Sequence, residues 1–186
     1  MLRVAFLLKQ LFLTKKHLDK KHFLIYNNLM KRKLYLDTSV ISALIDDRTP
    51  ERMADTLAFW AVLKQGAYNV VVSEIVLQEI DDSLNDKRDK MLMLLKQIPH
   101  EILDLTTEVN KLVKTYVELG LLAQKHKADL QHIAVATLNN CDYIASWNFK
   151  HFANTTVNAK VQGFNRVLGL KELYIFAPTM FLGGLQ

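Results

Sequence analysis

Short apolar segments rich in β-branched residues alternate with longer amphipathic segments through most of this 186-residue chain. The run Tyr68–Val72, bounded by turn formers, is typical of a buried strand. Glu51–Gln65 follows Pro50 and spaces its apolar residues like a helix that Gly66 ends. Because strands that alternate with helices form mostly parallel sheets covered on both faces, the pattern predicts an α/β fold with three layers, α/β/α.

The same reasoning assigns the other elements of the predicted fold. The remaining predicted strands are Lys33–Leu36, Ile102–Leu105, Tyr143–Ala145 and Leu173–Phe176. The remaining predicted helices are Val40–Ile45, a helix from Ser73 that carries Glu79, Leu84–Gln97, Thr107–Leu119, Asp129–Asn139 and Val157–Leu168. Half of the residues are apolar, which suffices for one well-buried core in a chain of this length.

The formal net charge of +5 comes from the first 30 residues, which hold six Lys or Arg and one Asp. Residues 31–186 balance at 18 basic and 18 acidic side chains, so any nucleic-acid site in them must be local. The longest apolar run of the first segment, Val4–Leu8, is far below the roughly 18 residues of a membrane span. We interpret residues 1–30 as a basic N-terminal extension, with Met30 as an alternative natural start, and residues 31–186 as the folded domain.

A single cysteine, Cys141, excludes an internal disulfide and a cysteine-based metal cluster. This usage fits a reducing cytoplasm, and we expect the thiol to be a small buried apolar group. Lysines interrupt the N-terminal segment where a secretory signal needs a continuous apolar stretch. The sequence therefore predicts a cytoplasmic protein without a membrane partner.

Polar residues gather where the predicted strands end. Asp37 follows the first strand, Glu79 and Asp129 lie in predicted helices, and Ser146-Trp147-Asn148 follows Tyr143–Ala145. In an open parallel sheet, sites form at the carboxyl ends of the strands. The chain has no Gly-rich phosphate loop, no G-x-S-x-G elbow and no H-E-x-x-H helix, which excludes the common nucleotide, serine-hydrolase and zinc-protease sites. Oxygen ligands for Mg²⁺ or Mn²⁺ remain.

Three strings resemble the PIN domain in their order, spacing and expected secondary structure: YLDTSVISAL, VVVSEIVLQEI and KADLQHIAVATLNNCDYIASWNFKHF. They look most similar to toxin nucleases of bacterial toxin–antitoxin pairs, the VapC type. The tail VNAKVQGFNRVLGLKELYIFAP resembles the closing helix and strand of that family. The resemblance runs from about Lys33 to Pro178 and implies a PIN-like fold.

The resemblance also implies a four-acid metal site that hydrolyses RNA phosphodiester bonds with Mg²⁺ or Mn²⁺. By position, the three acids and metal ligands are Asp37, Glu79 and Asp129, and Asn148 stands where the family often has Asp. The polar residues expected to support the ligands are Thr38, Ser39 and Ser146. Metal ions held by clustered carboxylates can activate water and neutralise charge on a phosphate. The implied partners are RNA, a cognate antitoxin and a second copy of the chain.

Several acids have structural interpretations as well. Asp37 could cap the following helix, although Thr38 and Ser39 could do this equally well. Glu74 lies roughly 140° from Glu79 around a helix, so both cannot face one site, and we interpret Glu74 as structural. The acids at 81 and 82 are interpreted as a solvated face.

The histidines and the aromatic residue near the site are also open to two interpretations. His132 and His151 lack ligand-spaced partners, so packing or surface roles are favoured. Trp147 could stack a base, but core packing is the more ordinary role. Lys125, His126 and Lys127 fit phosphate contacts or a solvated loop. The neutral Asn148 keeps open a PIN-like binding module with weakened catalysis, and an RNA-processing nuclease without an antitoxin is a third alternative.

Overall fold

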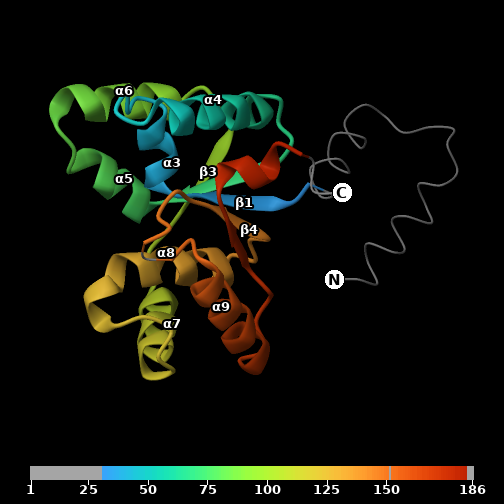
Figure 1. Cartoon of the computed structure of the whole chain (residues 1–186). Coiled ribbons are helices and arrows are strands. Elements are labelled where there is room, and N and C mark those ends of the chain that lie inside the picture. Colours follow the sequence, from blue (N-terminus) through green and yellow to red (C-terminus); the bar gives the residue numbers. More distant parts are fainter. Residues whose placement is uncertain (1–30, 151, 184–186) are drawn as a thin grey trace, which may run out of the picture. The chain divides into compact units, whose positions relative to one another are not determined.

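The computed structural model describes residues 31–150 and 152–183, which form an α/β fold around one sheet (Figure 1). Five parallel strands lie in the order β3-β2-β1-β4-β5. The strands are β1 (Lys33–Leu36), β2 (Asn69–Ser73), β3 (His100–Leu103), β4 (Tyr143–Ala145) and β5 (Tyr174–Phe176). The prediction of a central parallel sheet is therefore confirmed.

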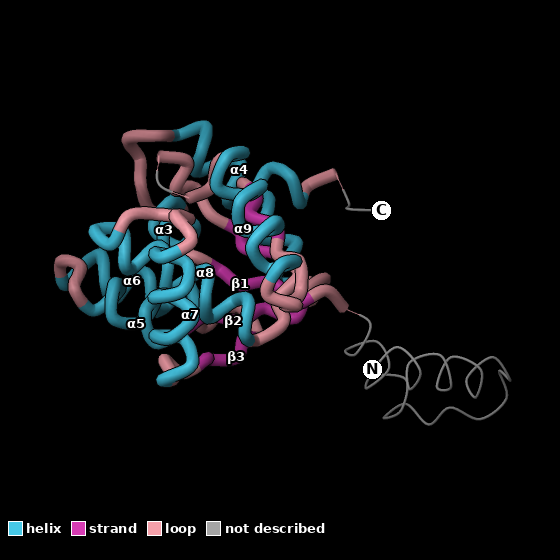
Figure 2. The backbone as a smooth tube through the Cα atoms, turned by 90° about the horizontal axis from the view of Figure 1, so that it is seen from below, coloured by secondary structure: helices cyan, strands magenta, loops and turns pink. Residues whose placement is uncertain are grey.

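Helices cover both faces of this sheet (Figures 1 and 2). On one face lie α3 (Thr38–Ala43), α4 (Pro50–Lys64), α5 (Glu74–Asp81) and α6 (Asn85–Leu95). On the other lie α7 (Thr107–Glu118), α8 (Lys127–Leu138) and α9 (Thr155–Val167). The chain moves outward from β1 to β3 and then returns to β4 on the far side of β1. Because crossovers between parallel strands keep one hand, this reversal moves the later helices to the opposite face.

The central strand is buried from both sides. Leu34, Tyr35 and Leu36 of β1 have no exposed surface, and β2 contributes the buried run of valines at 70–72. Such continuous apolar strands are expected in a parallel sheet between two helical layers. The direction of the chain reverses at β1, so β1 and β4 form the topological switch point of the sheet. In folds of this type, the crevice outside the carboxyl ends of such strands is the usual ligand site.

Most predicted elements agree with the structure to within one or two residues. Among the strands the largest offset is at β3, which was expected at Ile102–Leu105 and pairs with β2 over His100–Leu103. Two short 3₁₀ turns, η1 (Gln124–His126) and η2 (Pro178–Phe181), were not predicted. Cys141 is fully buried, as expected, and burial raises the pKa of its thiol to about 12. The extension 1–30 and His151 lie outside the described residues.

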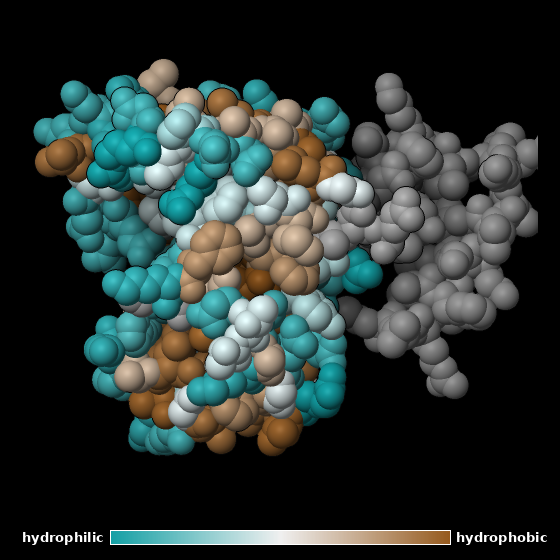
Figure 3. Space-filling model, viewed as in Figure 1, coloured by the Kyte–Doolittle hydropathy of each residue, from teal (hydrophilic) through white to brown (hydrophobic). Residues whose placement is uncertain are grey.

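The surface of the described domain has mixed polarity. Figure 3 shows hydrophilic residues over the side that holds α5 and α6. Apolar patches lie in the middle of the view and in its lower part, where Figure 1 places α7 and α9. None of the described helices is both long enough and apolar enough to span a bilayer.

Asp142 connects β1, β4 and the loop before β5 at the amino-terminal end of the strands, opposite the site. It precedes β4, and its Oδ2 atom accepts a hydrogen bond from the backbone N–H of Lys33, 2.8 Å away. Its Oδ1 atom lies 2.9 Å from Lys171 Nζ and 3.1 Å from a nitrogen of Arg32. Burial raises the pKa of this carboxyl, but the hydrogen bonds and charges of Lys171, Lys33 and Arg32 outweigh it, so the pKa is lowered. Asp142 therefore stabilises the fold as a carboxylate.

Replacing Asp142 by Asn is expected to lower the free energy of unfolding by about 1–2 kcal/mol at pH 7, near the low end for charge-assisted hydrogen bonds because Arg32 is exposed. Since the folded pKa is lowered, this contribution is present above the ordinary value of 3.8 and is lost as the pH falls through the folded pKa. Urea unfolding of both proteins at pH 7 and pH 3 measures it. A difference that does not shrink between pH 7 and pH 3 would contradict the charge argument.

Candidate active site

Asp37 stands directly after the central strand and is 4 % exposed. Its Oδ2 atom accepts hydrogen bonds from the hydroxyl of Ser39 and from Ser146 Oγ, the latter at 2.7 Å. The same oxygen receives the backbone N–H of Ser39 and so caps α3. The other oxygen, Oδ1, faces His132. The sequence left open whether Asp37 caps the helix or serves as a ligand. In the structure one oxygen caps the helix and the other is directed into the site.

Glu79 reaches the same place from the last turn of α5. Its Oε2 atom accepts a hydrogen bond from the hydroxyl of Thr38, and its Oε1 atom lies 3.3 Å from His132 Nε2. The side chain is 36 % exposed, so it lies at the mouth of the site. Burial raises the pKa of this carboxyl, but the hydrogen bonds and charge supplied by His132 and Thr38 outweigh it and lower the pKa. Glu79 is therefore held as a carboxylate.

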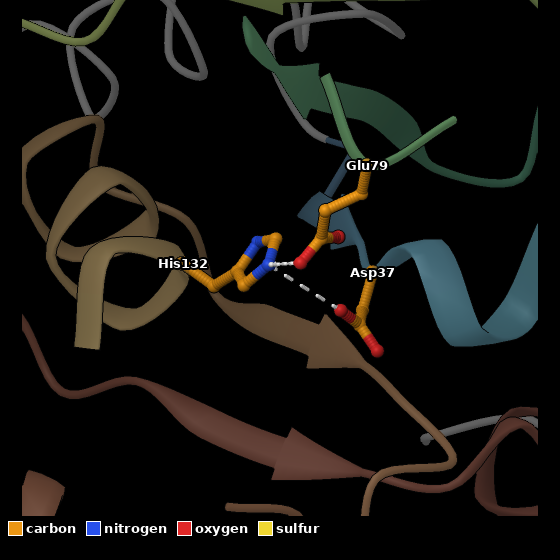
Figure 4. A group of neighbouring side chains, drawn as sticks. All are labelled: Asp37, Glu79 and His132. Atoms are coloured by element: carbon orange, nitrogen blue, oxygen red, sulfur yellow. Dashed lines mark hydrogen bonds and ion pairs between the residues drawn. The ribbon is translucent and has the colours of Figure 1, made fainter. Parts of the chain in front are cut away.

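His132 faces these two acids through one ring nitrogen (Figure 4). Its Nε2 atom is 3.3 Å from Glu79 Oε1 and 3.8 Å from Asp37 Oδ1. Its Nδ1 atom is 2.7 Å from the hydroxyl of Tyr35, which in turn lies 2.6 Å from Ser73 Oγ. The ring stacks on Phe152 with an interplanar angle of 6°. Burial lowers the pKa of His132, but the hydrogen bond to Glu79 and the neighbouring carboxylates raise it overall.

His132 is buried and stacks on Phe152, which agrees with the packing role, but its Nε2 atom also contacts two of the site acids, which the sequence interpretation did not predict. The sequence did hold a signal for it. His132 follows Asp129 by three residues on one helix, and residues at this spacing share a face. A buried position beside apolar residues concealed the contact, since the same pattern is typical of a core residue.

Asp129 and Asn148 complete the polar lining from α8 and from the loop after β4. Asn148 donates from Nδ2 to Asp129 Oδ1 at 3.0 Å, and its backbone N–H donates to Ser146 Oγ at 2.9 Å. His126 Nδ1 lies 3.4 Å from the other oxygen of Asp129. Asp129 is thus held on one side by an amide and on the other by an imidazole.

A pocket of about 380 Å³ opens over this arrangement. Its lining includes all four residues that the resemblance implied, together with two of the expected supporting residues. These are Asp37, Glu79, Asp129, Asn148, Thr38 and Ser39. The third supporting residue, Ser146, is fully buried beneath Asp37. The structure also adds lining residues that the sequence did not assign to the site: Ser42, Ser83, Lys87, Met91 and His132.

The donor set fits a divalent metal ion. One oxygen of Asp37, one oxygen of Glu79 and a ring nitrogen of His132 all lie within 4.8 Å of one another. Ligands about 2.1 Å from a shared ion are separated by roughly 3.0–3.4 Å, so the observed spacing needs only a small closure. Asp129 lines the same pocket and adds a third carboxylate. Concentrating negative charge in this way is unfavourable without a cation.

The remaining alternatives from the sequence also have places in the structure. Glu74 accepts the backbone N–H of Leu105 at 2.7 Å, so it fastens the end of β3 and does not face the pocket. Trp147 donates from its ring nitrogen to Thr56 at 2.9 Å, and the guanidinium of Arg52 lies 5.4 Å from its ring centre. These contacts favour the packing interpretation of Trp147.

Three comparisons with known proteins were made, and the match to a family model supports this architecture. Residues 34–155 match the family model of the PIN domain. Among solved structures, the chain is similar to one described as the crystal structure of VapBC2 from Rickettsia felis bound to a DNA fragment from their promoter. That match has a TM-score of 0.49 and 19 % identity, and it covers 78 % of this chain and 98 % of the other. The search of curated proteins found no match.

The family match and the site coincide. The matched residues run from the middle of β1 to the start of α9 and contain every acid that lines the pocket. The fold around them is the three-layer α/β/α arrangement with a parallel sheet that the resemblance led us to expect. On the extent of this match, which spans well over half of the chain, the protein belongs to the PIN domain family.

Proposed function

We propose that this protein is a metal-dependent endoribonuclease that uses Mg²⁺ or Mn²⁺ and hydrolyses RNA phosphodiester bonds. The observation that carries the proposal is the convergence of Asp37, Glu79 and Asp129 on one pocket at the switch point of the sheet. Carboxylate ligands at such a position suit a divalent ion and leave open coordination positions for phosphate oxygens. A bound ion of this kind supplies an activated water and neutralises charge that develops on the phosphate.

The residues around the acids have distinct tasks in this proposal. The hydroxyls of Ser39 and Ser146 fix one oxygen of Asp37, and the hydroxyl of Thr38 fixes one oxygen of Glu79. Asn148 fixes Asp129 by donating to its Oδ1 atom. Catalytic groups held in this way need little rearrangement when substrate binds, which lowers the entropic cost of reaction.

The test is an assay of the purified full chain against a mixed RNA pool. Cleavage products are read on a denaturing gel in Mg²⁺, in Mn²⁺ and in EDTA, with a single-stranded DNA pool as the control substrate. We expect cleavage of RNA with either ion and none in EDTA. Undiminished cleavage in EDTA would exclude metal dependence. Retention of RNA without cleavage in both ions would favour the binding-module alternative.

The proposal includes a cognate antitoxin and a homodimer, and both rest on the resemblance of the three sequence strings to toxin nucleases. Coexpression with the product of a small reading frame directly upstream tests the antitoxin. Suppression of RNA cleavage by that product supports a toxin. If no neighbouring product suppresses cleavage, the RNA-processing alternative gains support. Light scattering of the isolated chain gives its oligomeric state.

In this proposal, Lys87 contacts a phosphate group of the RNA substrate. Of the described residues that line the pocket, it alone is a lysine or arginine, and it reaches the pocket from α6. We therefore expect Lys87→Ala to weaken RNA binding and to reduce the slope of log Kd against log salt concentration by about one. Lys90→Ala is the matched control, because Lys90 is exposed on the same helix but does not line the pocket. Equal effects of the two variants would remove Lys87 from the substrate site.

A further inference from the structure

We propose that His132 is a direct ligand of the divalent ion, so that the site prefers Mn²⁺ to Mg²⁺. This inference shares its site with the proposed function and rests on it for the presence of an ion. It concerns a residue for which the sequence indicated only packing. With His132 as a ligand, the ion would be held by a nitrogen atom as well as by carboxylate oxygens.

The first argument is which carboxylate oxygens the hydroxyl donors leave available to an ion. Hydroxyl donors occupy Oδ2 of Asp37 and Oε2 of Glu79. The remaining oxygens, Oδ1 and Oε1, are the ones that face Nε2 of His132, at 3.8 Å and 3.3 Å. Figure 4 shows the three side chains directed toward one another from the junction between β1 and α3, from α5 and from α8. A shared ion about 2.1 Å from each atom requires separations of roughly 3.0–3.4 Å. The Glu79–His132 separation of 3.3 Å meets this, whereas Asp37 has to move closer.

The second argument is the hydrogen bond on the far side of the ring. Histidines that bind metal ions ordinarily donate their other N–H to a fixed acceptor, which sets the tautomer and the ring orientation. Here Nδ1 lies 2.7 Å from the hydroxyl of Tyr35, and that hydroxyl lies 2.6 Å from Ser73 Oγ. All three residues are buried. If Nδ1–H donates to Tyr35 and the Tyr35 hydroxyl donates to Ser73, Nε2 carries a lone pair, and a shared ion would take the place of its hydrogen bond to Glu79.

The third argument is the preference of the ions themselves. Mg²⁺ is a hard cation that takes oxygen ligands and releases its waters reluctantly. Mn²⁺ lies in the transition series, for which an imidazole nitrogen is a better ligand than for Mg²⁺. A set of two carboxylates and one imidazole therefore favours Mn²⁺. Removal of the imidazole should reduce this preference more than it reduces carboxylate binding of either ion.

A different role for His132 predicts the opposite result. If the ring serves as an imidazolium that pairs with Asp37 and Glu79, it competes with the ion for the same two oxygens. Its removal then strengthens the binding of both ions, because a like charge leaves the site. The sign of the change in affinity distinguishes a ligand from a competitor.

The experiment is pulsed electron paramagnetic resonance of the full chain loaded with Mn²⁺, with the histidines labelled by ¹⁵N in a parallel sample. We expect modulation from a coordinated imidazole nitrogen that changes with the isotope. His132→Gln should abolish it. His126→Gln is the matched control, since His126 contacts Asp129 rather than the group formed by Asp37, Glu79 and His132, and this variant should retain the modulation. If His132→Gln fails to fold, the labelled wild-type sample still shows whether a histidine binds the ion, and unchanged modulation in His126→Gln excludes the other histidine that contacts a site acid.

Titration calorimetry with each ion alone completes the test. We expect His132→Gln to raise the Kd for Mn²⁺ by at least about 10-fold and to raise the Kd for Mg²⁺ by less. Tyr35→Phe keeps the ring but removes its partner, and it should weaken Mn²⁺ binding by about 10-fold. Mn²⁺ binding without nitrogen modulation, or tighter binding by His132→Gln, would overturn the inference. Nitrogen modulation in a protein that cleaves no RNA would uphold it while rejecting the proposed function, and absence of Mn²⁺ binding would overturn both.

Discussion

Replacing Asp37 by Asn is expected to reduce RNA cleavage by more than about 100-fold, since loss of groups that merely support a metal ligand already costs about 10–100-fold. Asp37 is the most buried acid of the pocket and stands at the end of the central strand. The substitution removes the negative charge of its Oδ1 atom, which is the oxygen directed toward Glu79 and His132. An amide is a weaker ligand for a divalent ion because it lacks that charge.

The same substitution should leave the fold intact. Asn caps a helix about as well as Asp, and an amide oxygen still accepts the hydroxyls of Ser39 and Ser146. Removing a carboxylate from beside Glu79 also relieves repulsion, so thermal unfolding in EDTA is expected at the wild-type temperature or above it. Asp104→Asn is the matched control, because Asp104 also follows a strand, β3, but lies outside the pocket lining. Wild-type rates from Asp37→Asn would reject Asp37 as a ligand.

The strand pattern predicted the architecture well because the apolar runs of the sequence are the buried strands of the central sheet. β1, β2 and β4 are apolar in sequence and buried in the structure, so the pattern identified them directly. β3 behaves differently because it lies at the edge. His100 and Glu101 pair with β2 through their backbones, and Ile102 is 49 % exposed. Backbone pairing does not require apolar side chains, so hydrophobicity placed this strand two residues too late.

From topology alone, the sequence predicts a residue of the candidate site only where that residue follows a strand of the sheet. Asp37 stands directly after β1 and Asn148 lies in the loop that follows β4, so their place in the pocket follows from the topology. Lys87 reaches the pocket only because α6 packs against α3, a tertiary contact that no local pattern encodes. His132 was missed for a different reason: its neighbours are apolar, and only its hydrogen bonds to Glu79 and Tyr35 separate it from a core residue.

Asn148 is the one neutral residue among the four positions, and the structure gives its amide a definite partner. Its Nδ2 atom donates to Asp129 Oδ1 at 3.0 Å. In the variant Asn148→Asp this donor becomes a carboxylate oxygen, and two negative groups face each other in a partly buried pocket. Without a cation their repulsion destabilises the fold, whereas with a cation the added charge strengthens binding. The variant should therefore depend on metal more strongly than the wild type.

We expect Asn148→Asp to lower the melting temperature in EDTA and to increase the rise in melting temperature that saturating Mn²⁺ produces. The half-saturating Mn²⁺ concentration for cleavage should fall by about 10-fold, which is equivalent to about 1.4 kcal/mol of added charge attraction. Asn154→Asp is the control, because Asn154 also accepts and donates hydrogen bonds near this loop but caps α9 outside the pocket. Asn148→Ala separates the two roles of the amide: it removes the donor to Asp129 without adding charge, so it should weaken metal binding. Unchanged metal titrations for both variants at position 148 would mean that Asn148 only orders its own loop.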